Sequence, residues 1–113
     1  MITIDAQDKT LGRVASAAAK ALLGKGSATF AKNVVASEEV KVVNASKVRM
    51  TGDKTRAKAY VRYSGYPGGQ KFETYKHLAA RRGQSEAIRR AVMGMLPKNK
   101  LRARRIKFLI IEN

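Results

Sequence analysis

The chain has 113 residues, 44% of them hydrophobic, so it is long enough to bury a core, and we predict a single domain over residues 1–113. Its 24 Lys and Arg outnumber 8 Asp and Glu, and the net charge of +16 favours a polyanionic partner, nucleic acid first and an anionic membrane second. The absence of cysteine excludes disulfides and thiolate metal sites, and with a single histidine we expect no metal and no other cofactor.

The N-terminal part of the chain has the pattern of a strand, a helix and a second strand. Apolar and polar residues alternate over residues 2–6, which predicts a short strand. Apolar residues at helical spacing over residues 11–22 predict an amphipathic helix, with Asp8 or Thr10 as its N-cap. The apolar run around residues 42–43 indicates a strand buried on both faces. Together the three elements predict a βαβ crossover and an at least partly parallel sheet.

The middle of the chain contains two groups of turn-forming residues. Residues 48–51 and 58–63 read as strands that residues 52–56 could join into a hairpin. The segment YSGYPGGQK, residues 63–71, contains three glycines and a proline and is predicted to be a turn-rich loop. Residues 72–82 are predicted to be helical.

The C-terminal part begins with another predicted helix. Ser85 can cap this helix, Met95 is expected to fill the core, and Pro97 ends the helix because it excludes the helical conformation for the residue before it. A cationic stretch, KNKLRARR at residues 98–105, comes next and is called the strip below. Residues 106–111, IKFLII, are predicted to form the final strand.

Glycine and tyrosine gather around the turn-rich loop. Gly65 and Gly68 have the GxxG spacing with which some RNA-binding domains approach a nucleic-acid backbone, and Lys71 follows them. Tyr60, Tyr63 and Tyr66 could stack on bases or on ribose. A tight turn with tyrosines in the core explains the same residues, so both interpretations remain open on this observation alone.

The strip carries five cations, and no acid occurs between Ala87 and Ile111. A solvated charged face normally mixes both signs, so we interpret the strip as a surface that contacts phosphates. Its two apolar residues, Leu101 and Ala103, do not make a membrane-binding amphipathic face.

Catalytic chemistry has little to build on in this sequence. His77 is the one histidine, four residues after Glu73, and the remaining acids have no spacing typical of a metal site or an acid–base pair. We therefore predict that the chain is not an enzyme. No apolar run has the length of a membrane span, and the N-terminus lacks the order of a signal peptide, which favours a soluble intracellular protein.

The chain also contains a series of blocks in a characteristic order. They are Asp5-Ala6 with Lys9-Thr10-Leu11-Gly12-Arg13, Leu23-Gly24-Lys25, Val43-Asn44-Ala45-Ser46-Lys47-Val48, Thr51-Gly52-Asp53-Lys54, Lys58-Ala59-Tyr60, Ser64-Gly65-Tyr66-Pro67-Gly68-Gly69 and Ala91-Val92-Met93-Gly94-Met95-Leu96-Pro97-Lys98-Asn99. In this order the blocks resemble the bacterial form of the universal large-subunit ribosomal protein family numbered thirteen. The resemblance covers nearly the whole chain.

The resemblance implies an α/β fold, with a small, largely parallel sheet of about four strands, helices packed on it, a hairpin and basic loops. It also implies a structural constituent of the large ribosomal subunit that binds ribosomal RNA and supports early subunit assembly. The residues expected at RNA lie in or near the matched motifs: Lys9, Thr10, Gly12, Arg13, Lys25, Lys54, Lys58, Tyr60, Tyr63, Gly65, Gly68, Gly69, Lys71, Arg89, Arg90, Lys98, Asn99, Lys100, Arg102, Arg104 and Arg105.

The partners implied by the resemblance are large-subunit ribosomal RNA and neighbouring large-subunit ribosomal proteins, without DNA or a membrane. The expected location is the cytoplasm, within the ribosome. The alternative is a free regulatory RNA-binding module, which stable association with the ribosome would distinguish. The segment that bacterial members carry before the first strand and their longer C-terminal tail are missing, so the resemblance is to a form with shortened ends.

Overall fold

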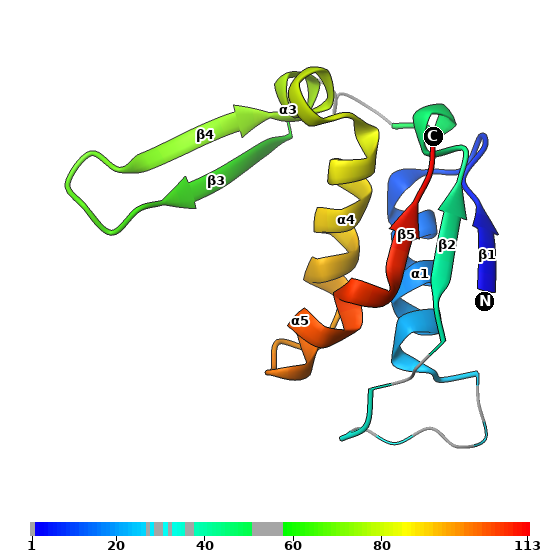
Figure 1. Cartoon of the computed structure of the whole chain (residues 1–113). Coiled ribbons are helices and arrows are strands. Elements are labelled where there is room, and N and C mark those ends of the chain that lie inside the picture. The colour runs from blue at the N-terminus through cyan, green and yellow to red at the C-terminus, as the bar shows by residue number, and fades with distance from the viewer. Residues whose placement is uncertain (1, 27, 29–30, 32, 36–37, 51–57) are drawn as a thin grey trace.

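The computed structural model describes residues 2–26, 28, 31, 33–35, 38–50 and 58–113. Three strands form a parallel sheet in the order β1-β2-β5, with β1 at Ile2–Asp5, β2 at Val40–Val43 and β5 at Leu109–Ile111. Helix α1 (Leu11–Leu23) lies between β1 and β2 in the chain (Figure 1). The predicted βαβ crossover, the α/β class and the largely parallel sheet are confirmed, with three strands in this sheet.

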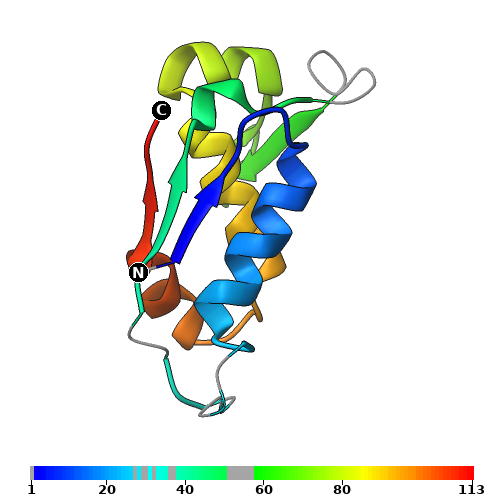
Figure 2. The ribbon, with the colours of Figure 1, turned by 90° about the vertical axis from the view of Figure 1, so that its right-hand side faces the viewer.

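Helices α1 and α4 (Gln84–Met95) pack side by side against one face of the sheet (Figure 2). In β2, Val40 and Val42 are fully buried toward the helices. Lys41 points to the other face, where its Nζ lies 3.0 Å from the carboxylate of Glu112. The prediction that β2 is buried on both faces is therefore wrong, because helices cover only one side of the sheet.

The core between α1, α4 and the sheet consists of small and branched side chains. Ala15 and Ala18 of α1 are fully buried, which lets α4 approach closely, and Ile88 and Val92 of α4 are equally buried. Gly24 adopts a left-handed conformation with φ of 77° and ends α1, as glycine does without the steric cost of a Cβ.

The hairpin occurs one strand later than predicted. Strand β3 (Ala59–Tyr63) pairs antiparallel with β4 (Gln70–Thr74), so the turn-rich loop is the hairpin turn and residues 70–74 are neither loop nor helix. Gly65 and Gly68 have φ of 88° and 72°, a region that glycine adopts readily and that reverses the chain here. The predicted linking loop at residues 52–56 lies outside the described residues.

The residues that were expected to pair with β3 do something else. Arg49 forms a single parallel bridge with Thr10, and residues 48–50 form no strand of their own. The helix predicted over residues 72–82 begins only at Tyr75, as α3 (Tyr75–Arg82). Thr74 caps it, because its hydroxyl accepts a hydrogen bond of 3.3 Å from the backbone N–H of His77.

Three boundaries near the C-terminus also differ from the prediction. Helix α4 begins at Gln84 after Gly83, so Ser85 lies inside the first turn and is not the cap. Part of the strip is helical, as α5 (Leu101–Arg105), and a short 3₁₀ turn follows at Ile106–Phe108, so the last strand starts at Leu109. Just before this helix, the side chain of Asn99 accepts a hydrogen bond of 3.1 Å from the N–H of Leu101.

Pro97 ends α4 as predicted, and Leu96 before it is extended with ψ of 149°. Met95 is not a core residue, because its side chain is 46% exposed. Among the described residues, no helix has the length and apolar character needed to cross a membrane.

Candidate nucleic-acid interface

Strands β3 and β4 and their turn, residues 59–74, form an arm that projects away from the sheet and helices (Figure 1). The pairing register gives the arm two different faces, since directly opposed residues share a face. Val61 opposite Phe72 lies on one face, and these side chains are 56% and 67% exposed. Exposed apolar faces of this kind are typical of surfaces that a partner covers.

The other face of the arm is polar and carries cations. Arg62 lies directly opposite Lys71, and Tyr60 lies opposite Glu73. Like charges directly opposed across two strands destabilise the pairing. Neither Arg62 nor Lys71 forms an ion pair with an acid in the described part of the chain. An anion placed against this face would relieve the repulsion.

The turn of the arm presents little side-chain bulk. Nothing lies within 4 Å of the position that a Cβ would take at Gly65 or Gly68, and both glycines are exposed. Gly69 is different, because a Cβ there would collide with the hydroxyl oxygen of Ser64. The loop can therefore be approached closely from outside at Gly65 and Gly68, whereas a side chain at Gly69 would require Ser64 to move. Tyr63 and Tyr66 beside it are 66% and 74% exposed, so the interpretation as core tyrosines is wrong for both.

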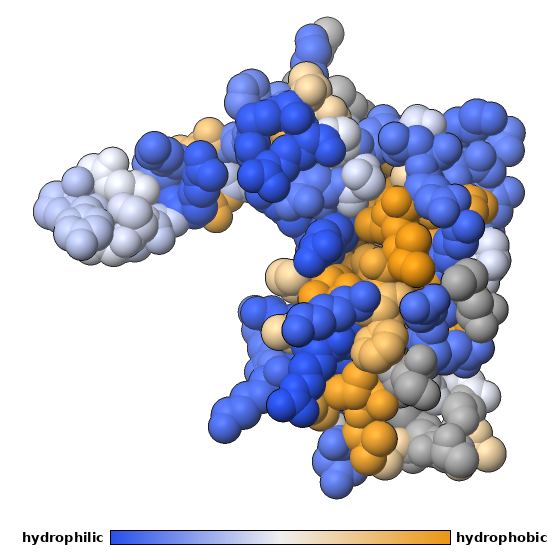
Figure 3. Space-filling model, viewed as in Figure 1, coloured by the Kyte–Doolittle hydropathy of each residue, from blue (hydrophilic) through white to orange (hydrophobic). Residues whose placement is uncertain are grey.

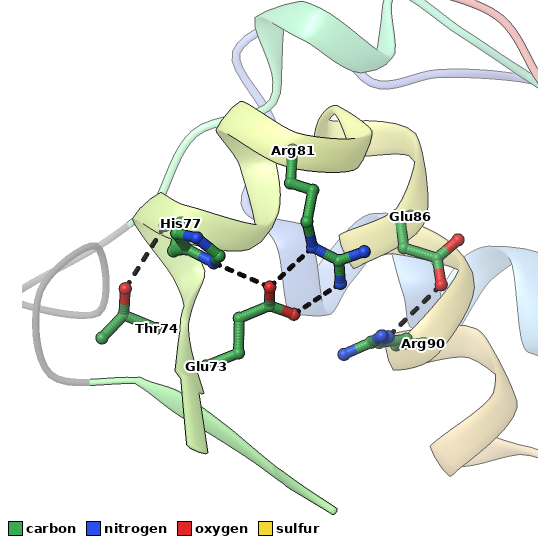
Figure 4. A network of polar contacts seen from close by, with 6 residues as sticks. All are labelled: Glu73, Thr74, His77, Arg81, Glu86 and Arg90. Carbon is green, nitrogen blue, oxygen red and sulfur yellow. Dashed lines mark hydrogen bonds and ion pairs between the residues drawn. The ribbon is translucent and has the colours of Figure 1, made fainter. Parts of the chain in front are cut away.

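A network of polar contacts joins the base of the arm to α3, and a separate pair, Glu86 and Arg90, lies beside it within α4 (Figure 4). Arg81 donates two hydrogen bonds of 2.8 Å to Glu73, from Nε to Oε2 and from Nη2 to Oε1. The Nδ1 atom of His77 lies 2.7 Å from Oε2 of the same carboxylate. The hydrogen bonds from Arg81, and then that from His77, lower the pKa of Glu73 from 4.5 to about 2.

Tyr60 occupies the centre of this base. The guanidinium carbon of Arg90 lies 5.1 Å from the centre of its ring and the Nζ of Lys58 lies 5.5 Å from it, both within the range of cation–π attraction. Burial, together with the neighbouring Tyr75, raises the pKa of the Tyr60 hydroxyl. Tyr60 therefore fits the interpretation as a packed tyrosine that holds the base of the arm better than the interpretation as an exposed residue that stacks on bases.

The strip divides between two environments. Lys98, Lys100 and Arg104 are exposed, and Arg102 is half-buried. Arg105 is only 1% exposed, and its Nη2 lies 3.5 Å from the backbone oxygen of Val34. The reason is helical periodicity: Arg105 follows Leu101 by four residues, so both occupy the inward face of α5. Arg105 was predicted at the RNA surface, and the structure does not bring it there.

The arm and the strip border one hollow. Figure 3 shows hydrophilic side chains on the arm and on the region around α5 below it, with a recess between the two. In Figure 1 the arm extends from near the N-terminal end of α4, and α5 lies at the C-terminal end of α4. Arg90 of α4 is half-buried and lies against Tyr60 of the arm, so it adds a cation on this side, and Arg89 beside it in the chain is exposed.

A second basic surface lies at the start of α1. Lys9, Gly12 and Arg13 are exposed there and Thr10 is half-buried. Arg49 joins them, because its N–H donates to the backbone oxygen of Lys9 at 2.8 Å. Arg49 was not predicted from the sequence, since only the bridge to Thr10 places it here.

The remaining predicted residues lie elsewhere. Lys25 is exposed just after the other end of α1, and Lys54 falls outside the described residues. Arg62, like Arg49, was not in the predicted set. Its alternation with Tyr60 along β3 puts both on one face, and the hairpin register was needed to identify Lys71 as its neighbour. No group of three or more metal-binding side chains occurs within the described ranges.

The family and the relatives of the chain agree with one another. The family model described as Ribosomal protein L13 matches residues 1–111. Large ribosomal subunit protein uL13 of Symbiobacterium thermophilum is 47% identical over 98 residues, which are 87% of this chain and 68% of the relative. The protein of the same name from Beutenbergia cavernae is 50% identical over 98 residues, 87% of this chain and 66% of the relative.

A third relative is matched over a longer stretch. Large ribosomal subunit protein uL13 of Pelotomaculum thermopropionicum is 45% identical over 106 residues, 94% of this chain and 73% of the relative. The chain thus spans between 66% and 73% of the length of these three proteins. With a family match over almost every residue and identities of this size, the chain belongs to the ribosomal protein L13 family in its bacterial form.

Proposed function

We propose that the protein is a structural constituent of the large ribosomal subunit, that it binds large-subunit ribosomal RNA through its basic surfaces, and that it supports early subunit assembly. The family and the names of the relatives support the ribosomal assignment. The observation that carries RNA binding is the cationic face of the arm, where Arg62 and Lys71 oppose each other with no described acid between them.

Phosphate contact explains this arrangement better than solvation does. Each phosphate neutralised by Lys or Arg releases condensed counterions, which gives binding energy that falls with salt. A-form RNA hides its base edges in a deep groove and is recognised mainly through shape, phosphates and 2′-hydroxyls. Cations held at fixed separations by a folded scaffold suit that form of recognition. In our proposal the sheet, α1 and α4 hold the arm, the strip and the start of α1 in place.

The basic surfaces fall into two groups, which would contact separate RNA segments. The arm and the strip border the hollow, while Lys9, Arg13 and Arg49 lie at the start of α1. The proposed partners are ribosomal RNA and neighbouring large-subunit proteins, in the cytoplasm within the ribosome. The proposed role is architectural and not enzymatic, which is also the character of the family.

Two measurements test the proposal. Fractionation of cell extract at moderate salt should show the protein with the large subunit and not free. Binding of the purified chain to large-subunit ribosomal RNA fragments should weaken with salt. The triple variant with Lys98, Lys100 and Arg104 changed to Ala should lower the slope of log K against log salt by about two to three.

A charge-matched control makes the second measurement specific. The triple variant with Lys20, Lys76 and Arg82 changed to Ala removes three exposed cations outside the proposed surfaces and should change the slope much less. Equal slopes for the two triple variants would argue that the strip faces solvent. RNA binding without association with the subunit would instead support the free regulatory module.

A further inference from the structure

An open pocket lies where the arm meets α4. It is lined by Tyr60, Val61 and Arg62 of β3, Glu73 of β4 and Arg90 of α4. The lining combines two guanidinium groups, an aromatic ring and a carboxylate within one recess. A pocket for a bare anion would need only the cations, so the carboxylate indicates a ligand that also carries hydrogen-bond donors.

Arg81 and Arg90, the two arginines next to this recess, differ in how many of their N–H groups already donate hydrogen bonds. Arg81 uses both Nε and Nη2 on Glu73. Arg90 donates only its Nε, at 3.3 Å to Oε1 of Glu86, and its two Nη groups have no hydrogen-bond partner among the described residues (Figure 4). Since Glu86 and the ring of Tyr60 fix its orientation, Arg90 presents a preorganised guanidinium edge.

Glu73 retains the capacity to accept one more hydrogen bond. A carboxylate has about four lone-pair sites, two on each oxygen. Arg81 and His77 occupy two on Oε2, and Arg81 occupies one on Oε1. The side chain is 12% exposed, and its pKa of about 2 keeps it ionised at neutral pH. One acceptor site on Oε1 is therefore open among the described residues, and Arg90 lines the same recess.

We propose that this pocket binds one ribonucleotide of an RNA strand, with its phosphate on Arg90 and Arg62 and its 2′-hydroxyl donating to Glu73. The proposal rests on the proposed function and adds a single point of contact that distinguishes RNA from DNA. A ribonucleotide matches the lining because it carries an anion and a neutral donor on one short framework. Inorganic phosphate offers the anion but is repelled by the carboxylate, and a deoxynucleotide within a strand offers no 2′-hydroxyl.

The test uses the full chain and three tetranucleotides of identical charge: uridine tetranucleotide, its 2′-O-methyl form and its 2′-deoxy form. Binding is followed by NMR of the labelled protein, with inorganic phosphate as a fourth probe. We expect the ribo form to perturb the signals of Tyr60, Arg62, Glu73 and Arg90 and to bind several-fold more tightly than the other three probes. The methylated form is informative because it removes the hydroxyl donor and keeps the sugar oxygen.

Two variants connect the preference to the pocket. Arg90→Lys keeps the charge but loses the planar fork, and we expect about tenfold weaker binding of the ribo form, the scale of one charge-assisted hydrogen bond. Arg62→Ala, on the exposed arm, should weaken binding without disturbing the packing of Tyr60. Arg82→Ala, an exposed cation of α3, is the control and should leave the preference for ribose unchanged.

The outcomes separate this proposal from the proposed function. Equal binding of the ribo, methylated and deoxy forms would overturn the ribonucleotide pocket, as would perturbations confined to other surfaces. If the same protein still binds large-subunit ribosomal RNA fragments, the proposed function stands and only the pocket is wrong. If it binds neither fragments nor tetranucleotides, both proposals fall.

Discussion

Arg81 and Glu73 come from different elements, α3 and β4, and two hydrogen bonds of 2.8 Å join them. This pair, with His77, attaches the base of the arm to the helical body (Figure 4). Farther out, most side chains of the arm are exposed, so no core supports it there. The direction of the arm is therefore set at its base, by this carboxylate and by the packing of Tyr60 against Arg90.

Acid should weaken this attachment, and the sign follows from the pKa of Glu73. The pKa is about 2 in the folded protein and 4.5 for an unperturbed glutamate. In the interval between these values the unfolded chain takes up a proton that the folded chain does not, so stability falls as the pH falls. The contribution is fully present above about pH 4.5 and is lost as the pH drops through about 2.

Urea unfolding of the protein and of Glu73→Gln over this range measures the contribution. The difference in the free energy of unfolding should be largest near neutral pH and shrink toward about pH 2. The difference in the free energy of unfolding between the protein and Arg81→Gln should depend on pH in the same way, because this change removes the principal cause of the lowered pKa of Glu73. A difference in the free energy of unfolding that stays constant with pH would show that the Glu73 carboxylate does not supply this pH-dependent stability.

The hydroxyl of Tyr75 gives a second prediction, about stability alone. The side chain is 3% exposed, and its hydroxyl is buried without a hydrogen-bond partner in the described part of the chain. A buried polar group in this condition costs about 1–3 kcal/mol of desolvation, so Tyr75→Phe should leave the stability unchanged or raise it by up to about 1 kcal/mol. Burial also raises the pKa of this hydroxyl, so it stays neutral at neutral pH.

Denaturant unfolding checks this, with Leu78→Ala as the contrasting variant. Leu78 is fully buried in the same helix, and its truncation should cost about 2–5 kcal/mol through lost contacts and a cavity. A loss above about 1 kcal/mol for Tyr75→Phe would mean that the hydroxyl makes a contact that the described residues do not provide.

The sequence predicted the elements whose signals are local. The apolar spacing of α1 and the alternation in β1 each identify an element from a few adjacent residues. The hairpin was misplaced because residues 70–74 carry both strand and helix signals, and only pairing with β3 decides between them. Likewise, the strip was treated as a linear cationic segment, whereas a turn of helix sends Arg105 inward with Leu101.

The basic surfaces could be predicted only in part, for the same reason. Lys71 and Lys98 were identified from local charge and from the turn beside them. Arg49 and Arg62 were missed because their roles depend on contacts between segments far apart in the chain or on hairpin register. The network around Glu73 was also missed, since the partner Arg81 is eight residues away and becomes adjacent only when β4 meets α3.

Gly12 supplies a prediction that separates stability from binding. It is the second residue of α1, and a Cβ there would meet nothing within 4 Å. The described structure therefore gives no reason for glycine, and Gly12→Ala should stabilise the isolated protein by up to about 1 kcal/mol. If RNA approaches the backbone here, the same change should weaken RNA binding.

Thermal unfolding and RNA titration on the same samples test Gly12→Ala. Ser16→Ala, on the exposed side of the same helix, is the matched control and should leave RNA binding unchanged. A Gly12→Ala variant that is more stable and binds equally well would show that the start of α1 does not touch RNA closely.

The opposed cations of the arm give the last prediction. Lys71→Glu turns the like-charged pair with Arg62 into an attractive one and should stabilise the hairpin by about 0.2–1 kcal/mol. The same change places a negative charge where we propose a phosphate, so RNA binding should weaken by more than removal of one contact would cause. Lys76→Glu, an equal change of charge on the exposed side of α3, should affect RNA binding much less.

Amide hydrogen exchange in β3 and β4 measures the stability of the arm. A gain in that stability together with lost RNA affinity would show that Arg62 and Lys71 serve RNA binding at the expense of arm stability. Equal RNA affinities for the two variants would remove the arm from the RNA interface.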